Sequence, residues 1–395
     1  MPAPSRRAEA VQLPIIPQVA DWIRQHPGTL SLGQGVAGYA PPPQAWTELL
    51  RLREQPALHR YQPVGGLPEL TQALAERWLR RSGVALGDER CLMVTAGANA
   101  AFLQAILAIC DPGDEVILPV PYYFNQEMAL ALANVRPVLV PTDAQYHPDL
   151  DRLRAAVTAR TRAVVTVSPN NPTGAVYPER CLRAINQFCG EQGLFHLSDE
   201  TYEDFVYDGA RHFSPGSFAG AAPHTISLYS FSKAYGFASW RVGYGLFPAN
   251  LLESLRKIQD THMICPPVAS QLAALGCLQA GEAWLKEKVA GLSVVRRHVL
   301  AGLEDLRKAE LIRSAPAEGA FYVLVTLPRG GDALELTHQL IREHRVAVIP
   351  GTAFGVSDEC CLRLAYGALE PASVPEAVGR FVVGLRRILA GSRAP

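Results

Sequence analysis

The sequence lacks an excess of either charge and any long apolar run. Lysine plus arginine and aspartate plus glutamate number 37 each, so no basic surplus indicates nucleic acid and no charge block indicates an interaction tail. No apolar stretch is long enough to cross a bilayer, and residues 1–12 lack the apolar core of a signal peptide. We therefore expect a cytoplasmic protein that binds neither nucleic acid nor membrane.

Paired cysteine motifs are also missing. None of the eight cysteines forms a Cys-x-x-Cys pair, and Cys360 and Cys361 are direct neighbours, which rarely bridge. No spacing resembles a zinc site. The cysteines are expected to be scattered buried or half-buried thiols, with no metal and no disulfide.

The sequence does contain a long alternation of apolar strands and helices. With 395 residues, 48% of them hydrophobic, the chain can form two large domains. The alternation predicts a mostly parallel sheet with helices on both faces, followed by a second unit from about residue 310. The first unit is expected to have strands at 92–95, 116–118, 138–140, 163–167, 194–198, 225–229 and 242–247 and helices at 100–110 and 179–192. The second is expected to have strands at 321–325, 346–350 and 361–365 and helices at 333–344 and 374–389.

Less regular segments surround this alternation. Glycines 33 and 35 and prolines 41–43 exclude a regular element there, although residues 17–26 fit a short helix. Residues 44–82 predict two helices broken at 60–66, where Tyr61 precedes two glycines. A helical stretch from 248 to 306, interrupted near 265–267, leads to the second unit.

Several polar residues stand where strands of a parallel sheet end, which is where such sheets bind ligands. Lys233 follows the strand at 225–229 and can form an imine, and Arg241 can hold an anion nearby. Residues 95–99 turn into a helix N-terminus, an arrangement that favours phosphate. Asp199 and the loop carrying Asn171 end two further strands. Three aromatics stand at 122–124, where an aromatic side chain could stack on a planar ring. At least one of the three is expected to pack in the core instead.

These motifs together resemble the fold-type I pyridoxal-phosphate enzymes of the class I/II aminotransferase family. The resemblance covers almost the whole chain and follows the family's order. It is carried by Tyr61 with Gly65-Gly66, Thr95–Asn99, Tyr123, Asn170–Gly174, Asp199–Tyr202, Ser230–Lys233, Arg241 and Arg363–Ala365. It implies an α/β fold, with a large domain at 46–290 built on a seven-stranded, mostly parallel sheet. It also implies a smaller α+β domain at 291–395, joined by an N-terminal arm at 1–45.

The resemblance implies a role for each matching residue near the cofactor ring. Lys233 would hold pyridoxal 5′-phosphate as an internal aldimine and later shuttle a proton. Asp199 would pair with the ring nitrogen and keep it protonated. Tyr202 and Asn171 would donate to the phenolic oxygen, and Tyr123 would stack on the ring.

Other matches concern the phosphate and the substrate. Arg363 and Asn171 would bind the substrate, with Arg363 clamping its carboxylate and Gly35 closing over it. The family residue that matches Tyr61 reaches the phosphate of the neighbouring subunit, which implies a homodimer with shared sites. The phosphate of the same subunit would be surrounded by Gly97, Ala98, Asn99, Ser230 and Arg241.

The resemblance implies an aminotransferase that moves an amino group from an α-amino acid to a 2-oxo acid in a ping-pong cycle. Asn99 stands where aspartate-preferring relatives have lysine, and Tyr39 could line a pocket, so neutral or aromatic side chains are expected. Ser239 replaces a glycine common in relatives. Two alternatives remain open: a carbon–sulfur lyase with the same cofactor, and a non-catalytic sensor of the same fold.

Overall fold

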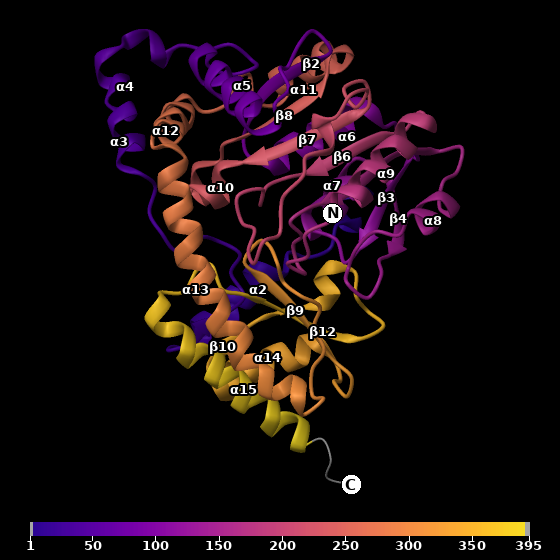
Figure 1. The fold of residues 1–395 in the computed structure, drawn as a ribbon, viewed down its shortest axis with the longest axis vertical. Coiled ribbons are helices and arrows are strands. Elements are labelled where there is room, and N and C mark those ends of the chain that lie inside the picture. Colours follow the sequence, from indigo (N-terminus) through magenta and orange to yellow (C-terminus); the bar gives the residue numbers. More distant parts are fainter. Residues whose placement is uncertain (1–2, 392–395) are drawn as a thin grey trace.

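The computed structural model describes residues 3–391, and a seven-stranded sheet forms its centre (Figure 1). Strand β8 is antiparallel to its neighbours β2 and β7, whereas the other pairs are parallel. The predicted mostly parallel sheet is therefore confirmed. The strand order is β2 (Arg90–Thr95), β8 (Gly243–Pro248), β7 (Thr225–Ser230), β6 (Phe195–Asp199), β5 (Thr161–Val167), β3 (Glu115–Val120) and β4 (Arg136–Pro141).

Helices bury both faces of this sheet. Because successive strand residues point to opposite faces, Leu118 packs with Phe102 of α6 (Ala98–Ile109), whereas Ile117 packs with Phe188 of α9 (Glu179–Glu191). This two-sided burial explains the nearly continuous apolar sequence of β5. Two short helices, α7 (Phe124–Leu132) and α8 (Leu150–Ala155), were not predicted.

A second body lies below the large sheet in Figure 1. Its antiparallel sheet has the order β11 (Ile349–Pro350), β12 (Cys360–Ala365), β9 (Tyr322–Leu327). The strand predicted at 346–350 is divided, because β10 (Val346–Ala347) pairs with β1 (Leu30–Ser31) instead. This pairing ties the N-terminal segment to the second body. Helices α2 (Ile15–Gln25), α14 (Ala333–His344) and α15 (Val374–Gly391) complete it.

The long helical region divides at a backbone irregularity. Helix α11 (Leu252–Met263) ends at Ile264, which has φ 65°, and two prolines follow before α12 (Val268–Gln279). Helix α13 (Gly281–Lys308) then runs from the large sheet to the second body in Figure 1. The remaining helices are α1 (Arg6–Ala10), α3 (Pro43–Leu49), α4 (Arg51–Glu54), α5 (Pro68–Ser82) and α10 (Phe231–Ala234).

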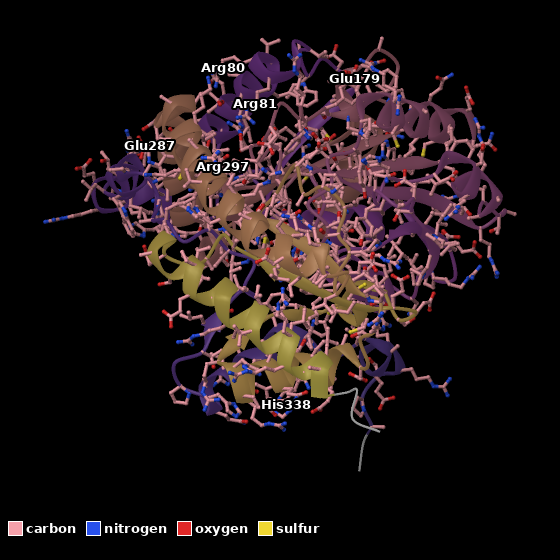
Figure 2. All side chains as sticks on the ribbon, turned by 60° about the horizontal axis from the view of Figure 1, so that its bottom comes forward. Arg80, Arg81, Glu179, Glu287, Arg297 and His338 are labelled. Carbon is pink, nitrogen blue, oxygen red and sulfur yellow. The ribbon has the colours of Figure 1, made fainter. Side chains whose placement is uncertain are left out.

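Charged side chains of both signs are spread over the surface. Figure 2 labels Arg80 of α5, Glu179 of α9, and Glu287 and Arg297 of α13, all of them exposed. All eight cysteines are free thiols, five of them buried and three half-buried, which agrees with the predicted burial. Within residues 3–391, no helix combines the length and apolarity needed to cross a membrane.

Candidate active site

Most of the predicted site residues meet in one cavity at the carboxyl ends of β5, β6 and β7. The cavity encloses about 490 Å³ of empty space, part of it open to solvent. This position is the usual ligand site of an open α/β sheet. The lining residues are Ala98, Asn99, Tyr123, Val167, Asn171, Asp199, Thr201, Tyr202, Ser230, Ser232, Lys233 and Arg241.

Lys233 lies in the short helix α10, directly after β7. Its Nζ donates to the carbonyl oxygen of Gly35 at 2.6 Å, so the N-terminal segment reaches the lysine. Burial, together with the nearby charges of Arg363 and Arg241, lowers the pKa of Lys233 to about 8. An amine with such a pKa is a ready nucleophile for a carbonyl compound.

Asp199 ends β6 and is 6% exposed. Its Oδ2 accepts from Nε2 of Gln126 at 2.9 Å, and its Oδ1 accepts from the backbone N–H of Thr201 at 3.1 Å. Burial raises the pKa of Asp199. Among the described residues no salt bridge reaches this carboxylate, so it suits a cationic group of a ligand.

An anion site lies at the start of α6. Gly97 precedes the helix with φ 87°, and a Cβ added there would come within 2.5 Å of a terminal guanidinium nitrogen of Arg241. Arg241 also donates to the carbonyl oxygens of Ala238 at 2.8 Å and Ala96 at 3.3 Å. The free amides of the first helical turn and this guanidinium face one place, which fits a phosphate.

Three tyrosines surround the remaining wall. Tyr123 lines the cavity and accepts from Nδ2 of Asn125 at 2.8 Å. The hydroxyl groups of Tyr202 and Tyr322 lie 2.6 Å apart, and Nδ2 of Asn171 donates to Tyr202 at 3.5 Å. Burial, followed by the neighbouring Tyr322, raises the pKa of Tyr202 well above its usual value. Tyr202 therefore stays a protonated donor.

Arg363 of β12 is a buried cation without a carboxylate partner among residues 3–391. Its terminal nitrogens donate to Oδ1 of Asn171 at 3.0 Å and to the carbonyl oxygen of Gly33 at 2.6 Å. Its Nε has no hydrogen-bond partner in the described structure. Since an unpaired buried charge is costly, this group fits an incoming carboxylate.

Five predicted residues do not line this cavity: Gly35, Gly97 and Arg363, described above, and the tyrosines 39 and 61. The hydroxyl of Tyr39 donates to the backbone carbonyls of Lys233 at 3.2 Å and Ala234 at 3.1 Å, so it supports the lysine segment. Tyr61 is 80% exposed and does not line this chain's own cavity. The substrate role of Tyr39 and the intersubunit role of Tyr61 stay predictions.

Two site residues were missed from the sequence. Gln126 lies in helix α7, which was not predicted, and Tyr322 lies in the strand predicted at 321–325, for which no site role was predicted. No local pattern marks either residue, because their partners are 73 and 120 positions away. The substitution at Ser239 introduces no strain, since Ser239 does not have a positive φ.

Known proteins with the same architecture are numerous. The family model "Aminotransferase class I and II" matches residues 27–381. An aromatic aminotransferase of Arabidopsis thaliana is 35% identical over 98% of this chain and 97% of its own length. An aspartate/prephenate aminotransferase of Thermus thermophilus is 36% identical over 83% and 84%. A solved structure of the aspartate aminotransferase from Thermus thermophilus with maleate has a TM-score of 0.88 and 33% identity, covering 97% of this chain and all of that one.

Proposed function

Because the chain belongs to the class I and II aminotransferases, we propose that it transfers amino groups with pyridoxal 5′-phosphate held at Lys233. The reaction moves an amino group from an α-amino acid to a 2-oxo acid in two half-reactions. When bound, the cofactor supplies an aldehyde that accepts the amino group and a ring that takes up the electron pair of the substrate Cα–H bond. The observation that carries the proposal is the convergence of Lys233 and Asp199 on one cavity.

The residues at the two ends of the cavity fit the two ends of this cofactor. Gly97, Arg241 and the first turn of α6 bind the phosphate, with Ser230 beside them. Asp199 holds a proton on the ring nitrogen, and its lack of a salt bridge within the described chain leaves it free to do so.

Lys233 is the residue that moves protons. Its free amine would take the proton from the substrate Cα and return it at C4′ of the bound cofactor. Its lowered pKa, about 8, keeps a useful fraction of the amine neutral near physiological pH. Tyr202 and Asn171 donate hydrogen bonds to the phenolic oxygen and hold the ring against Tyr123.

Arg363 binds the carboxylate of the substrate, and Gly35 closes over it. The buried, unpaired Nε supports this role, because a carboxylate would satisfy that group and its neighbour together. A Cβ on Gly35 would lie 2.4 Å from the hydroxyl of Tyr322, so only glycine allows the segment to come this close.

The preferred substrates carry neutral or aromatic side chains. The cations of this chain near the cavity are Lys233, Arg241 and Arg363, and each already has a role above. No further cation of the described lining is left for a second carboxylate. The guanidinium of Arg363 lies 4.6 Å from the centre of the Tyr322 ring and 5.0 Å from that of Phe354, which gives the carboxylate site an aromatic surround.

The active protein is a homodimer whose subunits share their sites. The exposure of Tyr61, 80%, suits a residue that completes the phosphate site of a partner subunit. A groove between α6 and α11, lined by Leu103, Leu107, Ile258 and Met263 among others, offers an apolar contact surface. Leu107 itself is 48% exposed in the single chain.

A half-reaction panel tests the function. Protein loaded with pyridoxal phosphate is mixed with one amino acid at a time, and the loss of the cofactor's visible absorbance is followed as the pyridoxamine form accumulates. Phenylalanine, tyrosine, leucine and methionine should convert the cofactor, with kcat/KM at least about tenfold above aspartate. Release of ammonia and pyruvate from cystathionine without the pyridoxamine form would identify a lyase. A protein that never acquires the absorbance would contradict the cofactor itself.

A further inference from the structure

Behind the candidate site, a buried carboxylate joins the ends of β6 and β7. Glu200 directly follows Asp199 and is 1% exposed. Its Oε2 accepts from the Tyr229 hydroxyl at 3.0 Å and lies 2.9 Å from Nε2 of His212. Its Oε1 accepts from the Ser214 hydroxyl at 2.9 Å. We call Glu200, His212, Ser214 and Tyr229 the Glu200 cluster.

This cluster lies on the opposite side of the strand ends from the cofactor cavity. Along an extended chain, successive side chains point to opposite faces. Asp199 and Ser230 line the cofactor cavity, whereas Tyr229 lines a different cavity with His212 and Ser214. The two cavities share no lining residue among those described. Glu200 lines neither cavity, so its contacts reach the cofactor site through its neighbours.

The hydrogen bonds of the cluster have a fixed direction. Burial and then the charge of Glu200 raise the pKa of Tyr229 well above its usual value, so its hydroxyl remains a donor. Burial opposes a charge on His212, but the hydrogen bond and charge of Glu200 raise the pKa of His212 overall. The backbone N–H of Glu200 also donates to Leu228 at 2.8 Å. Glu200 thus binds the end of β7 through both its backbone and its side chain.

We propose that Glu200 is a positioning residue that fixes the spacing between Asp199 and the Ser230–Lys233 segment. The inference rests on the proposed function, in which these two elements hold opposite ends of one cofactor. If the link to Tyr229 is lost, Asp199 moves relative to the ring nitrogen and stabilises its proton less well. With less positive charge on the ring, Nζ of Lys233, where it is joined to the cofactor, would hold its proton more tightly. The pH midpoint of the cofactor's visible absorbance then rises.

The experiment compares two cluster variants with a matched control. Glu200→Gln removes the charge at nearly constant shape, and Tyr229→Phe removes one donor. The control is Tyr207→Phe: Tyr207 is also buried, lines the same cavity, and donates its hydroxyl to the backbone of Ala320 at 2.8 Å. Each full-length protein is loaded with pyridoxal phosphate and titrated without substrate, and its cofactor Kd and Tm are measured.

Both cluster variants should raise the pH midpoint by about half a unit or more. They should also weaken cofactor binding about three- to tenfold and lower kcat more than they change KM. Tyr207→Phe should lower only the Tm.

Unmoved midpoints in both cluster variants, with a reduced Tm, would show a merely structural role and overturn the proposal. If Glu200→Gln does not fold, Tyr229→Phe decides alone, because it keeps Glu200 with two partners. A wild-type protein that takes up no cofactor would overturn the proposed function together with this inference. Normal wild-type absorbance with unmoved midpoints overturns only the positioning role.

Discussion

Lys233 is buried near the guanidinium groups of Arg363 and Arg241, and this environment favours the neutral form of its amine. Burial, Arg363 and Arg241 lower the pKa of Lys233 from 10.5 to about 8. Only the neutral amine attacks an aldehyde. At pH 7 roughly one lysine in ten is then neutral, compared with roughly one in a few thousand for an ordinary lysine.

The rate of cofactor uptake should increase with the fraction of Lys233 that is deprotonated. Below pH 8, the rate at which the cofactor-free protein gains visible absorbance with pyridoxal phosphate should rise about tenfold per pH unit, and it should level off above pH 8. Stopped-flow absorbance from pH 6 to pH 10 measures it. Lys233→Ala, the control, should show no such absorbance and no transamination. A rate that still climbs tenfold between pH 9 and pH 10 would mean that Lys233 keeps its ordinary pKa.

The proposed binding of the substrate carboxylate by Arg363 can be tested with the variant Arg363→Lys. Arg363→Lys keeps the charge but cannot make two parallel hydrogen bonds. The KM for phenylalanine should rise about 10- to 100-fold, which corresponds to about 1.4 to 2.7 kcal/mol. Phenethylamine, which lacks the carboxylate, is the matched substrate. Its kcat/KM should change little, so an undiminished preference for phenylalanine over phenethylamine in the variant would refute the carboxylate role.

At the scale of elements, the proposed phosphate site at the turn into α6 can be tested with the variant Gly97→Ala. Gly97→Ala would place a methyl group within 2.5 Å of Arg241, so the guanidinium must move. The affinity for pyridoxal phosphate should fall about tenfold, whereas that for pyridoxal, which lacks phosphate, should change little. Gly113→Ala is the matched control, since Gly113 has a similar φ, 94°, but nothing within 4 Å of its added Cβ. Equal losses of both ligands in Gly97→Ala would assign the effect to backbone strain.

Sequence patterns predicted those elements whose structure follows from the local pattern of apolar and polar side chains. The continuous apolar sequence of β5 and the amphipathic pattern of α9 are local properties, and both elements were found where they were predicted. The segment at 346–350 was predicted as one strand because its apolar character is unbroken. Tertiary pairing divides it, since β10 and β11 join different sheets. The local sequence pattern does not show which partner strand each half of the segment pairs with.

The site residues likewise fall into those that a local motif predicted and those that only tertiary contacts show. Residues that stand at strand ends inside recognisable motifs, such as Asp199 and Lys233, were predicted and lie in one cavity. Gln126 was missed because its helix α7 was missed, and its link to Asp199 exists only in the folded chain. Tyr322 fits its strand as an ordinary core residue, and only the contact of its hydroxyl with that of Tyr202 places it beside the site.

The whole molecule assembles its site from distant segments. We propose that residues 46–290 form the large domain, that 291–395 form the small one, and that 1–45 form the arm; residues 1–2 and 392–395 of these ranges lie outside the described part. Arg363 then reaches Asn171 across the domains at 3.0 Å, and Gly35 of the arm contacts Lys233 at 2.6 Å. A substrate bound between these groups would contact all three parts, which favours their closure around it.

Sharing of sites between subunits is testable with a hybrid dimer. If Tyr61 completes the site of the partner, one complete site needs Lys233 from one chain and Tyr61 from the other. Lys233→Ala and Tyr61→Ala chains carrying different tags are co-expressed, and the hybrid is purified through both tags. One of its sites would then carry both substitutions and the other none. The hybrid should show about half the wild-type kcat per dimer at the wild-type KM, with limiting pyridoxal phosphate.

Unshared sites would give a different result, because each would carry a single substitution. The hybrid would then have only the mean activity of the two variant homodimers, and the intersubunit role of Tyr61 would be wrong. Because Tyr61 is 80% exposed, its replacement should leave the fold of each chain intact, which the Tm of the Tyr61→Ala homodimer checks. Leu107→Arg supplies the second control: a charge in the α6–α11 groove should yield monomers by light scattering and abolish the recovery of activity in the hybrid.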